Sequence, residues 1–132
     1  MNIIYTDGSC IKNPNGPGGY AYIVINPDGL EWYFSDGDKS TTNNRMELKA
    51  VIESLKHIEV NEKCKVYSDS QLTINCAIGK WKRKANLDLW SEYDKVSKDK
   101  IIEFEWVKAH NGNKYNEIVD KMALEESRKI KI

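Results

Sequence analysis

Carboxylates at the expected ends of two strands are the side chains best placed to do chemistry in this sequence. Asp7 is the last residue of a short predicted strand, residues 3–7, and begins an Asp-Gly-Ser turn, and Asp69 directly follows another strand over residues 64–68. A right-handed crossover through one helix would make these strands parallel neighbours, so both carboxylates would emerge at one sheet edge. Like charges this close resist ionisation unless a cation lies between them. We therefore expect a divalent-metal site with oxygen ligands, which suit Mg²⁺ or Mn²⁺.

Two further acids are candidates for the same site, and every acid also has an ordinary structural explanation. Glu47 lies near the start of a long predicted helix, and Asp120 lies within the last one. Asp7 can be a turn former, Glu47 can form a capping box with Asn44, Asp69 can be a helix N-cap, and Asp120 can be a solvated charge.

His110 lies on a glycine-containing loop, residues 109–113. It is either an ordinary exposed loop histidine or, beside metal-binding carboxylates, a group that shuttles protons near its usual pKa of about 6.5.

Hydrophobic periodicity and turn residues predict the elements that carry these side chains. Strands are expected at residues 3–7, 20–25, 30–34, 64–68 and 101–107, and helices at about 41–58, 70–78, 87–96 and 115–129. The Pro-Asp-Gly turn at 27–29 joins two strands as a hairpin, so the first three strands form an antiparallel meander. The pattern predicts an α/β fold with a mixed five-stranded sheet, three antiparallel strands followed by two parallel ones, flanked by helices.

Size and charge limit the classes of function. The 132 residues are expected to form one domain over 1–132, and 40% hydrophobic with 30% charged residues is typical of a soluble globular chain. Lysine plus arginine number 20, as do aspartate plus glutamate, so the net formal charge is zero. A polyanion must then bind through a local basic patch or through metal ions.

Cysteine use and hydropathy predict the compartment. Cys10, Cys64 and Cys76 are odd in number and have no CxxC spacing, which disfavours a disulfide framework or a zinc site. No apolar run approaches the ~20 residues that cross a bilayer, and the start has no signal-peptide pattern. We expect a cytoplasmic protein that does not bind membranes, and a monomer, since no long apolar surface stretch requires a partner.

Several strings of the sequence, in this order, resemble type 1 ribonuclease H over residues 3–125. TTNNRMEL is long and specific, whereas TDGS or SDSQ alone would be weak. The strings are Tyr5–Cys10 (YTDGSC), Asn13-Pro14, Gly16–Gly19 (GPGG), Thr41–Leu48 (TTNNRMEL), Ser68–Gln71 (SDSQ), Asn86–Trp90 (NLDLW) and Trp106–His110 (WVKAH).

The resemblance implies a ribonuclease H-like fold and an endoribonuclease that hydrolyses the RNA strand of RNA–DNA hybrids with two metal ions. It implies 5′-phosphate and 3′-hydroxyl ends, two Mg²⁺ ions per site and Mn²⁺ as a substitute. By resemblance, Asp7 bridges the ions, Asp120 completes the ion that activates water, and Glu47 and Asp69 hold the ion beside the leaving oxygen. His110 matches a histidine on a mobile loop.

The resemblance also implies substrate contacts on both strands of the hybrid. Amide and hydroxyl groups suit a 2′-hydroxyl, which both donates and accepts. The groups expected to face RNA are Ser9, Cys10, Asn13, Asn43, Asn44 and Gln71. Thr42 and Asn86 match a phosphate pocket for the DNA strand, and Trp81 is placed to lie against the DNA backbone. Asn86 has an alternative explanation as the N-cap of its helix.

The sequence departs from the family pattern in two places. Ser40, next to Lys39, stands where many members carry an arginine, so the DNA pocket is weaker or Lys39 substitutes. Only residues 79–85 stand where many bacterial members carry an extra basic helix and loop. The four cations of 80–84 are either what remains of that basic handle or a solvated face.

Two other functions compete with hybrid cleavage. One is a catalytically silent hybrid-binding module on the same fold, because fold does not fix function. The presence of all four acids and the loop histidine argues against it. The other is a different two-metal phosphoryl transfer, such as the DNA cleavage of integrase-like relatives; the TTNN and SDSQ strings, with their RNA-facing amides, favour hybrid cleavage.

Overall fold

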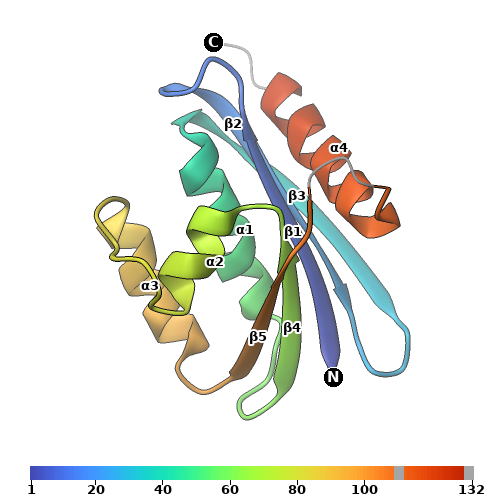
Figure 1. The fold of residues 1–132 in the computed structure, drawn as a ribbon. Helices are drawn as coiled ribbons and strands as arrows, with labels where there is room; N and C mark the ends of the chain where they lie inside the picture. Colours follow the sequence, from blue (N-terminus) through green and yellow to red (C-terminus); the bar gives the residue numbers. More distant parts are fainter. Residues whose placement is uncertain (109–111, 130–132) are drawn as a thin grey trace.

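The computed structural model describes residues 1–108 and 112–129, which form one five-stranded sheet with helices packed on it (Figure 1). Along the chain the elements are β1 (Asn2–Cys10), β2 (Gly16–Ile25), β3 (Glu31–Thr41), α1 (Asn43–Leu55), β4 (Lys63–Ser68), α2 (Gln71–Ala77), α3 (Leu87–Ser97), β5 (Ile101–Trp106) and α4 (Lys114–Lys129). The strand order is β3-β2-β1-β4-β5, with antiparallel pairs β1–β2 and β2–β3 and parallel pairs β1–β4 and β4–β5. The predicted fold class is confirmed.

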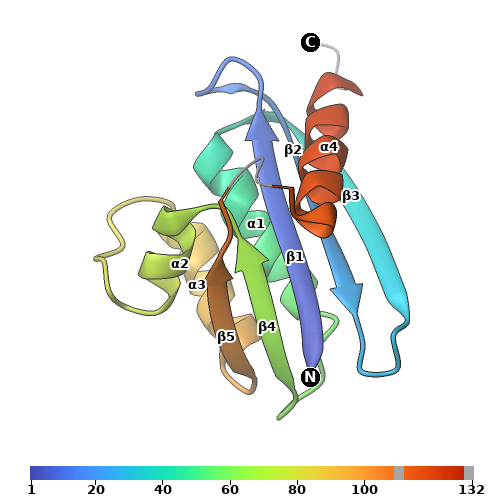
Figure 2. The ribbon, with the colours of Figure 1, turned by 45° about the vertical axis from the view of Figure 1, so that its right-hand side comes forward.

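Helices cover both faces of the sheet (Figure 2). The larger hydrophobic cluster lies between the sheet and the helices α1 and α3, and it includes Ile4, Val51 and Trp90. The smaller cluster lies under α4 and includes Ile23 and Val119. β1 is packed between α1 and α4, and β4 buries Cys64 and Val66 on the side of the larger cluster. Asp7 lies on β1, and Asp69 directly follows β4. None of the helices in the described part of the chain is long and apolar enough to cross a membrane.

The first three strands are longer than predicted. β1 does not turn at Asp7, because Gly8 pairs with Tyr20 and Cys10 pairs with Gly18 of β2. Likewise, β3 runs on through Ser35–Asp38, beyond the strand predicted at 30–34. Backbone pairing with a neighbouring strand outweighs the weak strand propensity of glycine, serine and aspartate. The explanation of Asp7 as a turn former is therefore wrong.

The helix caps also differ from the prediction. The N-cap of α1 is Thr42, whose side-chain oxygen accepts a hydrogen bond from the backbone N–H of Arg45 at 3.1 Å. The N-cap of α2 is Ser70, whose hydroxyl accepts from the backbone N–H of Thr73 at 3.1 Å. The predicted helix capping therefore explains neither Glu47 nor Asp69.

Candidate active site

The register of β1 and β4 brings Asp7 and Asp69 to equivalent positions. The parallel pairing ends at Tyr5 and Tyr67, whose rings stack with centroids 4.8 Å apart, and each aspartate lies two residues further on. Asp7 is buried and Asp69 is half-buried. The indole N–H of Trp106, at the end of β5, donates to the Asp69 carbonyl at 3.0 Å. That bond fixes the backbone as it leaves β4.

Gly8 allows the third acid to reach the same place. A Cβ atom at Gly8 would lie 2.3 Å from the backbone nitrogen of Glu47 and 2.4 Å from the carbonyl carbon of Met46. Only glycine permits this close approach of β1 to the first turns of α1. Glu47 is consequently pressed against β1 and is buried, with 8% of its surface exposed.

The four predicted acids meet at this point. One carboxylate oxygen from each of Asp7, Glu47 and Asp69 lies within 4.8 Å of the others. Asp120, half-buried on α4, shares a hydrogen bond with Asp7, which also shares one with Glu47. Asp7 is therefore central, with Glu47 on one side and Asp120 on the other.

The electrostatics of this cluster disfavour several negative charges at once. Burial is the main reason why the pKa of the Asp7 carboxyl is raised to about 8, and the charge of Asp69 raises it further, against the Glu47 hydrogen bond. The backbone N–H of Gly8 donates to Oδ1 of Asp7 at 2.8 Å, which also opposes the rise. The pKa of Glu47 is raised well above its usual value, first by burial and then by the charge of Asp7.

The residues present fit a divalent cation. Within the described residues, the buried oxygen Oε2 of Glu47 has no hydrogen-bond partner. A buried carboxylate oxygen without a partner is costly, and a cation would satisfy it while offsetting the neighbouring charges. The donors are all carboxylate oxygens, which suits a hard ion such as Mg²⁺. His110 lies outside the described residues, so its placement beside this cluster stays a prediction.

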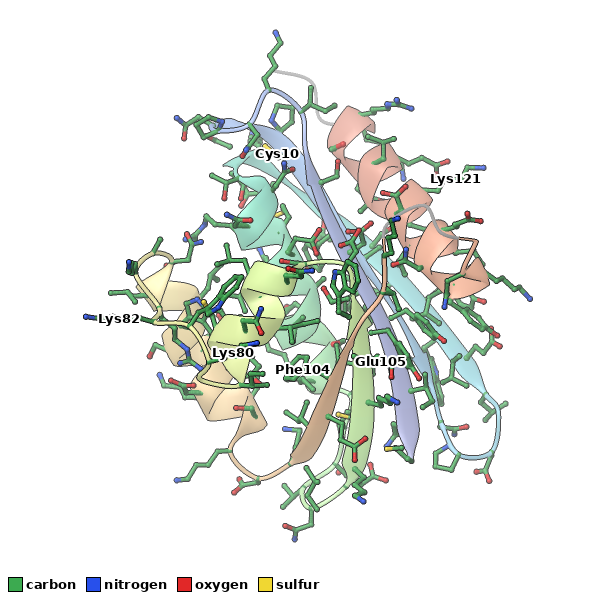
Figure 3. The ribbon with its side chains drawn as sticks, in the orientation of Figure 1. Cys10, Lys80, Lys82, Phe104, Glu105 and Lys121 are labelled. Atoms are coloured by element: carbon green, nitrogen blue, oxygen red, sulfur yellow. The ribbon has the colours of Figure 1, made fainter. Side chains whose placement is uncertain are left out.

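The residues expected to face RNA gather around the first turns of α1 and α2. Oδ1 of Asn13 accepts from the backbone N–H of Asn43 at 3.1 Å, which joins the β1–β2 loop to α1. The Cys10 thiol donates to backbone carbonyls, including that of Thr41 at 3.4 Å, so it is directed into the protein at the end of β1 (Figure 3). Ser9 is half-buried, and the side chains of Asn43, Asn44 and Gln71 are exposed at the starts of the two helices.

The two residues of the expected DNA pocket are joined through Arg45. Its Nη1 donates to Oδ1 of Asn86 at 3.2 Å, and its backbone N–H donates to Thr42. Asn86 occupies the N-cap position of α3 in a left-handed conformation with φ 57°, but its side chain makes no capping hydrogen bond. The N-cap explanation of Asn86 is thus correct for its position at the start of α3, but its side chain does not act as the cap.

The predicted basic segment divides into one structural cation and three exposed ones. The Nε of Arg83 donates to the Cys76 carbonyl at 3.1 Å, and its Nη1 lies 2.9 Å from both carboxylate oxygens of Asp94. The guanidinium carbon also lies 4.3 Å from the ring centroid of Trp90. Arg83 therefore attaches the 79–85 loop to α2 and α3. The exposed residues of this segment are Lys80, Trp81, Lys82 and Lys84, and Figure 3 shows Lys82 pointing away from the protein.

Comparison with known proteins decides the family. The RNase H family model matches residues 1–128. The chain belongs to the RNase H family. A "Ribonuclease H" of Treponema denticola is 42% identical over 160 residues, covering 98% of this chain and 99% of the relative. A "Ribonuclease HI" of Campylobacter jejuni is 45% identical over 136 residues, covering 96% and 91%. The prediction of a ribonuclease H enzyme is thereby confirmed at the level of the family.

Solved structures agree with this RNase H assignment. The N-terminal RNase H domain of a Mycobacterium tuberculosis protein, solved as a fusion with maltose-binding protein, superposes with a TM-score of 0.84 at 26% identity, covering 97% of this chain and 94% of that one. LC11-RNase H1 in complex with an RNA/DNA hybrid has the same TM-score at 22% identity, covering 98% of each chain, and shows the fold alone.

Sequence reasoning missed four residues that position this RNase H site: Gly8, Arg45, Arg83 and Trp106. Arg45 and Trp106 stand within the strings that suggested the family, but nothing in a string shows what a side chain contacts. Gly8 was predicted to lie in a turn. Arg83 was predicted to belong to a group of cations that either binds the substrate or is only solvated.

Proposed function

We propose that this chain is an endoribonuclease that hydrolyses the RNA strand of RNA–DNA hybrids. The observation that carries the proposal is the cluster of Asp7, Glu47 and Asp69 within 4.8 Å, with Asp120 hydrogen-bonded to Asp7, in a chain of the RNase H family. The names of its relatives, "Ribonuclease H" and "Ribonuclease HI", support the same activity.

The acids would hold two Mg²⁺ ions, with Mn²⁺ as a substitute. Asp7 shares hydrogen bonds with both Glu47 and Asp120, which supports its proposed role as the carboxylate that would bind both ions. Asp120 would complete one ion site, and Glu47 with Asp69 would complete the other. When bound, the ions would supply an activated water and stabilisation of the leaving oxygen in an in-line displacement. The products would carry 5′-phosphate and 3′-hydroxyl ends.

The remaining predicted residues would bind and orient the hybrid. Side chains at the starts of α1 and α2 would contact 2′-hydroxyls, which distinguish the RNA strand. Cys10 would contribute mainly through its backbone, because its thiol is directed to internal carbonyls. Thr42 and Asn86 would hold a DNA phosphate, Trp81 would lie against the DNA backbone, and His110 would transfer protons.

We further propose that residues 1–132 act as one catalytic domain and as a monomer in the cytoplasm. Cys10, Cys64 and Cys76 are all free thiols, which suits a reducing compartment.

The test is cleavage of end-labelled RNA paired with DNA, paired with RNA, and single-stranded, each with Mg²⁺, Mn²⁺ or EDTA. We expect cutting confined to the hybrid, abolished by EDTA and by Asp7→Asn, and products that a 5′-phosphate-dependent ligase accepts. Asp28→Asn is the matched control, because Asp28 is an exposed aspartate in the β2–β3 turn and should leave activity unchanged. Hybrid binding without cutting under every condition would refute the enzyme and indicate the silent module.

A further inference from the structure

We propose that Arg45 is a positioning residue that directs two neutral hydrogen-bond donors, Thr42 and Asn86, at one phosphate of the DNA strand. This inference rests on the proposed function and adds to it a residue that does not itself contact the substrate. It is carried by the hydrogen bonds of Arg45, which reach the N-terminal ends of both α1 and α3.

Arg45 hydrogen-bonds to the side chains of both Thr42 and Asn86. Its backbone N–H donates to Oγ1 of Thr42 at 3.1 Å, and its Nη1 donates to Oδ1 of Asn86 at 3.2 Å. The same guanidinium binds the carboxylate of Asp88 through two hydrogen bonds, Nη1 to Oδ1 at 3.0 Å and Nη2 to Oδ2 at 2.8 Å. Asp88 therefore holds the planar guanidinium group of Arg45 in place while Nη1 of that group also contacts Asn86.

These bonds turn two ambivalent groups into donors. A hydroxyl and a primary amide can each donate or accept, whereas a guanidinium can only donate. Arg45 therefore requires the oxygen of the Asn86 side chain and leaves its NH₂ group to donate outward. The backbone N–H of Arg45 likewise occupies the Thr42 oxygen in an N-cap bond, which leaves the hydroxyl proton for another partner and does not depend on the side chain at position 45. A phosphate presents only acceptors, so this arrangement matches it.

The side chain of Asn86 does not cap its helix in this arrangement. An asparagine at an N-cap normally has an extended backbone and accepts a hydrogen bond from the first turn of its helix. Asn86 instead has φ 57° and ψ 37° and makes no such bond. The unused cap and the left-handed backbone are accounted for if the side chain is held for Arg45 and for a ligand.

The charge of Arg45 is balanced by Asp88, whose side chain is 65% exposed while that of Arg45 is 33% exposed. The phosphate contact would accordingly come from neutral donors. This separates a positioning role from direct binding by a cation, because only a cation that contacts phosphate changes the number of counterions released.

The experiment uses hybrids with a single neutral methylphosphonate moved along the DNA strand. With wild-type enzyme, one position should raise KM. In Arg45→Met we expect KM on the normal hybrid to rise roughly fivefold to tenfold, as for the loss of one ordinary hydrogen bond, with kcat within about twofold. The KM penalty of that methylphosphonate should then shrink markedly, since Asn86 is no longer held as a donor and only Thr42, whose bond comes from the backbone N–H of residue 45, still presents its hydroxyl.

Lys56→Met is the matched control, because Lys56, at the C-cap of α1, pairs with Glu92 of α3 at 3.1 Å. It removes the same kind of bridge between the same helices and should leave the methylphosphonate profile unchanged. Arg45→Lys should behave like Arg45→Met, because an ammonium lacks the fork that serves both Asn86 and Asp88. If Arg45→Met does not fold, Asp88→Asn can be used instead, because it frees the guanidinium of Arg45. This variant should also reduce the KM penalty of the methylphosphonate, but by less.

Three results would overturn the inference while leaving the proposed function intact. The first is an unchanged methylphosphonate profile in Arg45→Met, and the second is a normal KM in Arg45→Lys. The third is a salt slope of hybrid binding that falls by about 0.9 in Arg45→Met, which would mean that Arg45 binds phosphate directly. A wild-type protein that cleaves no hybrid would instead refute the proposed function.

Discussion

Replacing Asp7 with asparagine should make the metal-free protein more stable near pH 8, even though it should abolish cleavage. Asp7 is only 2% exposed, and burial is the main cause that raises the pKa of its carboxyl to about 8. Asparagine has nearly the same shape and carries no charge. The substitution therefore removes a charge that the fold disfavours when no cation is bound.

The sign and size follow from proton linkage. The pKa of Asp7 rises from its usual 3.8 to about 8, so between these pH values the folded state binds a proton that the unfolded state does not. Stability is then highest below about pH 4 and is lost as pH rises through 8. At 1.36 kcal/mol per tenfold difference in proton affinity, the loss is at most about 6 kcal/mol. The buried asparagine amide must still be hydrogen-bonded, so we expect a gain of about 1–3 kcal/mol at pH 8 and almost none at pH 4.

Urea unfolding in EDTA at pH 4.5 and pH 8 would measure this, with Asp28→Asn as the exposed control. Adding Mg²⁺ at pH 8 should stabilise the wild type, since a ligand that binds only the folded state adds RT ln(1 + [L]/Kd), and should do much less for Asp7→Asn. If Asp7→Asn is less stable than wild type in EDTA at pH 8, or keeps the same pH dependence, Asp7 does not carry the unfavourable charge.

Three further variants test how the site is held and how the hybrid is bound. Gly8→Ala should destabilise the fold by about 3 kcal/mol and abolish activity, because the new Cβ would lie 2.3 Å from the backbone nitrogen of Glu47; near-normal thermal unfolding would contradict this. Arg83→Met should lower Tm by roughly 3–6 °C and speed proteolysis within residues 79–85, because Arg83 attaches this loop; an unchanged cleavage pattern would contradict that role. Lys82→Gln with Lys84→Gln should raise KM for hybrid and reduce its salt slope by up to about 1.8, and unchanged values would show that these lysines are only a solvated face.

The sheet could be predicted because its order depends on hydrophobic pattern and crossover handedness. The ends of its strands could not be predicted, because they depend on pairing. Gly8, Ser9 and Cys10 have weak strand propensity, but β2 lies beside them and continues the ladder to Gly18. A local Asp-Gly signal carries no information on whether a partner strand is present.

The meeting of Asp7 and Asp69 could likewise be predicted, since both follow the last parallel pairs of neighbouring strands. Glu47 and Asp120 needed the family resemblance, because each sits on a helix where a solvated or capping role is ordinary. The contribution of Arg45 could not be foreseen. It depends on how α3 lies against α1, and that arrangement is set by the packing of Trp90 and Leu89 in the core.

Two arginines near the expected DNA side are paired with carboxylates, and this limits how strongly a protein of zero net charge attracts a polyanion. Arg45 is paired with Asp88 and Arg83 with Asp94, so neither adds free positive charge at the expected DNA side. That leaves the exposed Lys80, Lys82 and Lys84 of the 79–85 segment, together with the exposed Lys39 next to the expected DNA pocket. Four phosphate contacts would lower affinity only roughly 150-fold between 50 and 200 mM salt, whereas six to ten contacts would lower it about 10³–10⁵-fold. Hybrid binding by this chain should therefore depend less on salt than on its neutral donors and on divalent ions held by the four acids.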